Sequence, residues 1–111
     1  MRFNCLFTVR NLLPAFRSII TKQLVTKHGL TQEQTASKLG ITQAAISNYL
    51  NSKRAAKCRE LLGDDFLPVY SLACENAEKL ANDKTNIDEV KKEFCKVCNY
   101  LREKYVENYI I

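Results

Sequence analysis

The stretch TQAAISNYLNSKR, residues 42–54, carries uncharged polar side chains at a spacing that places them on one side of a helix. Glutamine and asparagine can each form two hydrogen bonds with an adenine edge, serine can bond several base edges, and an alanine methyl group can contact the methyl group of thymine. This set of side chains is suited to the major groove of DNA. We predict base contacts from Gln43, Ala44, Ser47 and Asn48.

Hydroxyl, amide and cationic side chains stand at or near the ends of this helix and of the helix before it. Such groups at helix ends meet phosphates, which fixes the register on the duplex without reading its sequence. We therefore expect double-stranded DNA as the partner. The predicted phosphate contacts are Thr31, Gln32, Thr42, Ser52, Lys53 and Arg54.

Two short helices must position these side chains, and the sequence LTQEQTASKLGITQAAISNYLNSKR has the signals for both. Thr31 and Gln34 have the spacing of a capping box, and Thr42 is an N-cap residue for the second helix. Gly40 allows the turn between them a positive backbone angle. These signals predict a helix-turn-helix. A plain helical hairpin with its polar side facing water, or a helix-turn-helix that binds protein, would share them.

The charges divide the chain into a basic and an acidic part. Residues 1–63 contain ten Lys or Arg against two Asp or Glu, a net charge of +8, whereas residues 64–111 contain seven against ten, a net charge of −3. The length of 111 residues is that of one domain. We predict a DNA-binding region at 1–63 and a helical dimerisation region at 64–111 on the same core. An ordinary lysine-rich surface is the alternative explanation of the basic charge.

Apolar residues at three- and four-residue spacing predict further helices at 12–28, at 65–82 and from residue 87 onwards. A short helical or irregular piece is expected near 59–62, and strand-like alternation is confined to 3–7. The sequence therefore predicts an all-α fold. It consists of a helix-turn-helix bundle followed by two C-terminal helices, about five helices in total.

The terminal helix has an apolar stripe in a nearly seven-residue repeat, which is typical of helices that associate with one another. A single helix-turn-helix reaches few bases, so such domains ordinarily act as two copies on neighbouring half-sites. We predict a homodimer whose contact surface comprises Phe94, Val97, Leu101 and Tyr105.

Five cysteines are present, and two of them are one helical turn apart, where two thiolates can reach one metal ion. A zinc ion or an iron–sulfur cluster would need further ligands. The alternatives are that these cysteines fill the core, or that they form a disulfide or act as redox thiols. The candidate metal ligands are Cys5, Cys74, Cys95 and Cys98, with Cys58 in reserve.

The helix-turn-helix sequence quoted above resembles the Cro/repressor type. The order of VRNLLPAFRSIITKQLVTKHG, this segment and FCKVCNYLR is similar to a family of small archaeal predicted transcriptional regulators. It also resembles the N-terminal module of archaeal thiamine-phosphate synthase/regulator proteins. The resemblance covers nearly the whole chain and implies a dimeric DNA-binding regulator. No thiamine-related activity is carried over, because we expect no further ligand-binding or catalytic domain in this sequence.

Other classes of protein lack support in the sequence. No apolar run is long enough for an ordinary membrane span, and the N-terminal residues do not have the pattern of a signal peptide. We find no Ser/His/Asp set and no glycine-rich phosphate loop, so an enzyme is not expected. The sequence predicts a cytoplasmic regulator, with a metal-dependent redox sensor and a protein-interaction module as alternatives.

Overall fold

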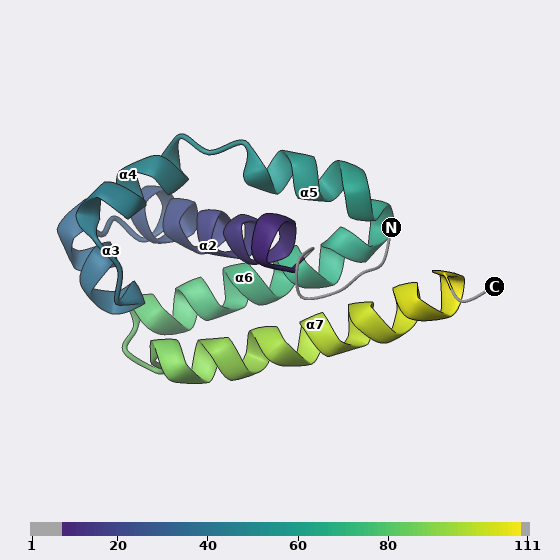
Figure 1. Ribbon diagram of the computed structural model, residues 1–111. Coiled ribbons are helices and arrows are strands. Elements are labelled where there is room, and N and C mark those ends of the chain that lie inside the picture. Colours follow the sequence, from purple (N-terminus) through teal and green to yellow (C-terminus); the bar gives the residue numbers. More distant parts are fainter. Residues whose placement is uncertain (1–7, 110–111) are drawn as a thin grey trace.

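The computed structural model describes residues 8–109, with side chains for residues 10–103, and it is an all-α fold (Figure 1). Two π-helical turns, η1 (Thr8–Leu12) and η2 (Gln23–Lys27), extend the first α-helix at its two ends, and the 3-10 turn η3 (Gly63–Asp65) follows the fourth. The predicted helix-turn-helix bundle is confirmed. The α-helices are α2 (Leu13–Lys22), α3 (Gln32–Leu39), α4 (Gln43–Leu50), α5 (Arg54–Leu62), α6 (Phe66–Ala81) and α7 (Ile87–Tyr109).

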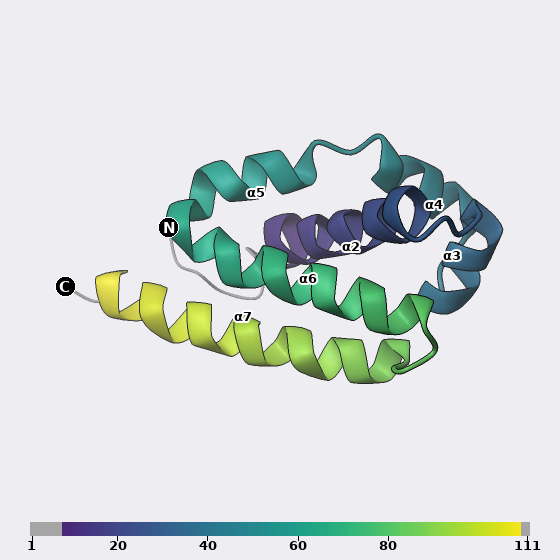
Figure 2. The same ribbon diagram turned by 180° about the vertical axis from the view of Figure 1, so that it is seen from behind.

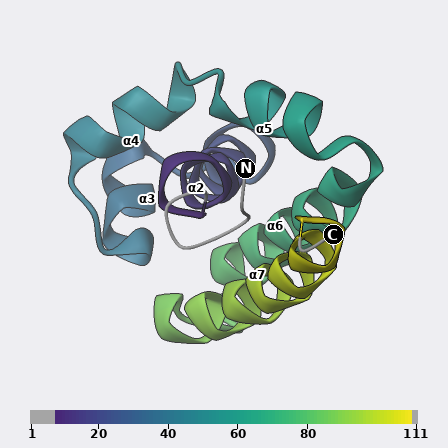
Figure 3. The same ribbon diagram turned by 45° about the vertical axis from the view of Figure 1, so that its right-hand side comes forward.

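Helix α2 lies at the centre of the molecule, with α4 and α5 on one side and α6 and α7 on the other (Figures 1 and 2). It begins with Pro14 in its first turn, where a missing N–H costs no hydrogen bond. Buried residues are spread around α2, as expected of a helix with neighbours on several sides: Ala15, Phe16, Ser18, Ile19, Ile20 and Thr21. Figure 3 shows the other helices arranged around it.

The C-terminal helices α6 and α7 form a hairpin that covers the far side of α2. Helix α6 contacts α2 directly, and α7 packs along α6. The buried stripe of α7 also reaches α2, since the rings of Phe16 and Phe94 lie 4.8 Å apart between centroids. Lys38 of α3 forms an ion pair with Asp83 in the turn between α6 and α7, and this pair links the hairpin to α3.

The piece near 59–62 is neither short nor irregular: it is the end of α5, which begins at Arg54 and buries Cys58 and Leu62 against the core. The strand-like alternation at 3–7 lies outside the described residues. Among the helices of the described part, none combines the length and the apolar character needed to cross a membrane.

Candidate nucleic-acid interface

The turn between α3 and α4 has the geometry that its sequence predicts. The Thr31 hydroxyl accepts a hydrogen bond from the Gln34 N–H at 3.0 Å, and the Gln34 side chain accepts one from the Thr31 N–H at 2.9 Å, which completes the capping box. Gly40 ends α3 with a φ of 66°, a conformation that other residues adopt only with strain. The Ile41 N–H then bonds the Ala36 carbonyl at 3.1 Å. These bonds fix the angle between the two helices.

Helix α4 is held by its inner face. The Thr42 hydroxyl accepts a hydrogen bond from the Ala45 N–H at 3.1 Å, and the Ile46 side chain is completely buried. The buried Ser18 hydroxyl of α2 donates to the Tyr49 carbonyl at 3.1 Å. Because α4 is attached on this side only, its opposite side faces solvent.

The predicted base-contact residues Gln43, Ala44, Ser47 and Asn48 are all exposed on that outer side. Within the described part of the chain, the side chains of Gln43, Ser47 and Asn48 form no hydrogen bonds. Their donors and acceptors are therefore available to an external partner. The structure brings these residues together as one polar, uncharged surface, here called the α4 face.

The predicted phosphate-contact residues surround the α4 face. Thr31, Thr42, Lys53 and Arg54 are exposed, whereas Gln32 and Ser52 are partly buried. The Ser52 hydroxyl accepts a hydrogen bond from the Arg54 N–H at 3.0 Å, and the Lys22 ammonium donates to the Ser52 carbonyl at 2.8 Å. Ser52 therefore also has a local role, because it fixes the loop that leaves α4.

Arg54 differs from the prediction in one respect. Its guanidinium donates a hydrogen bond to the Arg10 carbonyl at 2.9 Å, so part of its bonding capacity is used to hold α5 against the start of the helical region. A guanidinium has five N–H donors. Enough of them remain for a phosphate in addition to this contact.

The sequence interpretation missed Lys57, which lies one turn beyond Lys53 and Arg54 on α5. An open groove of about 670 Å³ runs between α4 and α5, and it is lined by Asn48, Lys53, Arg54 and Lys57 among others. The signal was the three-residue spacing of Arg54 and Lys57, which places both cations near one side of a helix. The sequence predicts a helical piece only near 59–62, so this spacing falls outside any predicted helix.

The first turn of α5 is an electropositive position. It contains no acidic residue, and basic side chains stand at the end of the helix where the dipole is already positive. The N–H groups of a first helical turn also lack carbonyl partners within the helix. Basic side chains and unpaired N–H groups at the positive end of the dipole repel one another, and a bound anion would offset this repulsion. A phosphate at the edge of the groove is such an anion.

The comparison with protein families agrees with this geometry. Residues 22–61, from the end of α2 to α5, match the family model described as Helix-turn-helix. The match and the geometry of α3 and α4 agree that this segment is a helix-turn-helix, and the matched model is of the Cro/C1 type. Such domains are DNA-binding regulatory modules and are generally not enzymes. The chain matches no curated protein and no solved structure.

Outside the helix-turn-helix domain, two of the predicted dimer residues have another role. Phe94 is 7% exposed and Leu101 is fully buried, because both pack into the core of their own chain. They are not available to a second subunit in this structure, which corrects the predicted surface. Val97 is partly buried against the same core, and the side chain of Tyr105 lies outside the described part.

The candidate metal ligands are not gathered in the described part of the chain, where no three His, Cys, Asp or Glu residues are placed to share a metal ion. Cys95 is exposed on α7, Cys98 faces the core and Cys74 is partly buried on α6. Cys5 lies outside the described residues. A hydrogen bond with Cys74 raises the pKa of Tyr70.

Cys58, the reserve ligand, is a buried thiol whose pKa is raised by burial to about 11. Its side chain is completely buried on the inner side of α5. Cys58 is therefore a packing residue beneath the basic outer side of that helix.

Proposed function

We propose that this protein is a sequence-specific transcription regulator that binds double-stranded DNA as a homodimer, with α4 in the major groove. The observation that carries the proposal is the α4 face, where Gln43, Ser47 and Asn48 present unbonded polar groups beside a groove lined by cations. Amide and hydroxyl side chains of this kind are the groups that hydrogen-bond base edges in the major groove.

The phosphate backbone is the proposed partner of the helix ends. Thr31 and Gln32 stand at the start of α3, Thr42 at the start of α4, and Lys53 at the start of α5. Each position offers backbone N–H groups or a side-chain donor to a phosphate oxygen. We add Lys57 to this set, because it lines the same groove. These contacts supply affinity and register, while the α4 face supplies sequence preference.

The decisive experiment is selection of bound fragments from random DNA, followed by affinity measurements on the preferred site and on random DNA. Replacing Gln43 or Asn48 by Ala should cost about 1–3 kcal/mol on the preferred site and little on random DNA. The matched control is Asn99→Ala, an exposed asparagine on α7. Equal losses on both DNAs would contradict base readout.

A homodimer needs a contact surface, and we place it at the corner of α5 and α6. Leu61 and Leu67 are 50% and 67% exposed, and Tyr70 is 42% exposed on the next turn of α6. A groove of about 730 Å³ lies beside Leu67 and Tyr70. Exposed large apolar side chains in one area are typical of association surfaces, and a second copy of this chain is the occupant that DNA half-sites require.

Sedimentation of the full chain tests this surface. Leu67→Asp should shift the protein from dimer to monomer and weaken operator binding, because a carboxylate in an apolar contact is poorly solvated. Ser71→Asp, at an exposed position of the same helix, is the control and should remain dimeric. A dimer that persists in Leu67→Asp would place the interface elsewhere.

Two finer interpretations remain predictions. The first is the narrower similarity to small archaeal regulators, which extends beyond the segment that the family model matches. The second is the cytoplasmic location, which follows from the proposed role in regulating transcription. A protein-interaction module is the competing interpretation of the same fold. It predicts that the unmodified protein binds DNA only weakly at physiological salt, and that replacing Gln43 and Asn48 leaves its function intact.

A further inference from the structure

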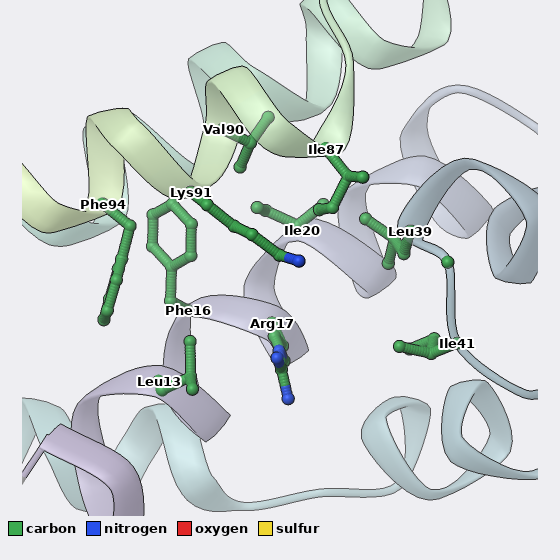
Figure 4. A pocket seen from close by; sticks show the side chains of 11 residues that line it. Leu13, Phe16, Arg17, Ile20, Leu39, Ile41, Ile87, Val90, Lys91 and Phe94 are labelled. Atoms are coloured by element: carbon green, nitrogen blue, oxygen red, sulfur yellow. The ribbon is translucent and has the colours of Figure 1, made fainter.

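A further cavity, of about 120 Å³, lies behind the helix-turn-helix, on the side away from the α4 face. It is bordered by α2, by the turn between α3 and α4, and by α7 (Figure 4). Each of its three sides contributes apolar side chains, with Phe16 and Ile20 from α2, Leu39 and Ile41 from the turn, and Phe94 from α7. An apolar cavity of about 150 Å³ accommodates one benzene ring, so this one suits a body of that size or slightly smaller.

Two cations interrupt this apolar wall. Arg17 comes from α2 and Lys91 from α7, and Figure 4 shows the Lys91 side chain reaching away from its own helix toward α2. No Asp or Glu lines the cavity. Within the part of the chain that the structure describes, neither cation has an ion pair or a hydrogen bond.

This arrangement is unusual for the helix that provides it. The next two lysines of α7, Lys92 and Lys96, each lie within 4.0 Å of a glutamate one turn earlier. Lys91 has no such partner among the described residues, and it lines the cavity together with a second cation, Arg17. Two like charges at the wall of one cavity repel each other, and a bound anion would offset that repulsion.

We propose that this cavity binds a small carboxylic acid with an apolar body of about one ring, and that this ligand is an effector of the DNA-binding domain. The ring would occupy the space between Phe16, Ile20 and Ile41. The carboxylate would lie between Arg17 and Lys91, where a guanidinium can donate two parallel hydrogen bonds. An inorganic anion would leave the apolar wall unused, and a neutral ring would leave both cations without a partner.

The effector role rests on the proposed function, whereas the carboxylate site does not. Gly40 and Ile41 belong both to the cavity wall and to the turn that sets the angle of α4. A ligand that fills the cavity therefore contacts the turn, α2 and α7 at once. If it fits one position of the turn better than another, it changes DNA affinity, and DNA changes its affinity by the same factor.

The site is tested without DNA, using benzoate as the probe and benzamide as its neutral counterpart of nearly equal shape. Titration followed by amide resonances should give saturable shifts at Gly40 and Ile41 with benzoate. Benzamide should bind at least about tenfold more weakly, which corresponds to about 1.4 kcal/mol. Absence of saturable shifts with benzoate, or equal binding of the two probes, would overturn the site.

Variants of the two cations make the test specific. Lys91→Gln should reduce benzoate affinity about tenfold and leave benzamide unchanged, whereas Lys92→Gln, one position along the same helix, should leave both unchanged. Arg17→Gln should act like Lys91→Gln. Lys91 is exposed, so its replacement keeps the fold, and a circular dichroism spectrum confirms this. Unchanged benzoate affinity in Lys91→Gln would overturn the assignment.

The effector role is tested by operator affinity with and without saturating benzoate. A change of at least about fivefold is expected, the lower end of typical allosteric coupling, and it should disappear in Lys91→Gln. If benzoate binds but operator affinity does not change, the effector role is wrong and the site stands. If no DNA is bound under any condition, the proposed function fails and the effector role with it, while the benzoate titration still decides the site.

Discussion

The two sides of α2 differ in whether their exposed lysines have acidic partners. On the α4–α5 side, the exposed Lys53 and Lys57 have no acidic partner among the described residues, and the first turn of α5 contains no acid. On the α6–α7 side, three lysines pair with glutamates one turn earlier on the same helix, whereas Lys91 lines the cavity without such a partner among the described residues. These pairs are Lys79 with Glu75, Lys92 with Glu89, and Lys96 with Glu93.

The α4–α5 side therefore presents cations without acidic partners in the described part of the chain, whereas on the α6–α7 side three lysines are already neutralised by glutamates. Exposed pairs at one-turn spacing contribute little to stability, but they cancel charge locally. Cations without a partner keep their full field, which attracts and orients a polyanion. The side that carries the helix-turn-helix, here called the display side, exposes its polar and cationic side chains. The α6–α7 hairpin, here called the brace, packs against α2 and supports the fold.

The brace is tested by emptying its contact with α2. Phe94→Ala should lower the free energy of unfolding by about 3–5 kcal/mol, because it leaves a cavity beside Phe16, whose ring lies 4.8 Å away. Urea unfolding measures the change. Tyr100→Ala, at a 54% exposed position of the same helix, should change stability by less than about 0.5 kcal/mol. Similar losses in the two variants would mean that α7 does not brace the core.

The buried side of α5 gives a smaller, pH-dependent effect. In the folded protein, burial raises the pKa of the Cys58 thiol to about 11, so the thiol keeps its proton until the pH approaches that value. In the unfolded chain the thiol ionises near its ordinary pKa of 9.0. The unfolded state is therefore favoured as the pH rises, and stability is lost progressively between these two values. The expected loss is about 2–3 kcal/mol, since each pKa unit corresponds to about 1.4 kcal/mol.

Comparison of variants isolates this effect from the titration of lysines and tyrosines. Cys58→Ala should be less stable at neutral pH but should lose less further stability between pH 9 and pH 11 than the unmodified chain. Cys95→Ala, which replaces an exposed cysteine, should keep the full loss. The same loss in Cys58→Ala as in the unmodified chain would show that this thiol is not the group responsible.

The display side could be predicted from sequence because its signals are local. The capping box of Thr31 and Gln34, the positive φ at Gly40 and the cap at Thr42 each involve residues within four positions of one another. Once these signals fix the two helices, the helical repeat decides which side of α4 faces outward. The base-contact residues therefore occupy the exposed side that the pattern predicts, although their contact with DNA stays a prediction.

The brace could be predicted only in part, because periodicity identifies an apolar stripe and not what covers it. The stripe through Phe94 and Leu101 fits a second subunit as well as it fits α2, and the structure places both residues in the core of one chain. The meeting of Arg17 and Lys91 across one cavity is likewise a tertiary feature. No local signal relates residues so far apart in the sequence.

The start of α5 was missed for a local reason. Its N-cap is Lys53, whose side chain makes no capping hydrogen bond within the described residues, and the Ser52 hydroxyl one position earlier accepts a hydrogen bond from the Arg54 N–H. The usual N-cap signal is therefore absent at the first residue of α5, and the sequence predicts helix only further along. The consequence for function is the position of Lys57, which a helix brings into the groove beside α4.

The smallest expected effect concerns Lys57 and sharpens the contrast between the two sides. Its replacement by Gln should weaken binding to all DNA sequences by a similar factor, because a phosphate contact carries no base preference. The plot of log affinity against log salt should become shallower by about 0.9, the contribution of one phosphate. Lys79→Gln, which removes a lysine already paired with Glu75 on α6, should leave both the affinity and the slope unchanged. An unchanged slope in Lys57→Gln would remove α5 from the interface, whereas equal slopes in the two variants below that of the unmodified chain would mean that net charge alone attracts the DNA.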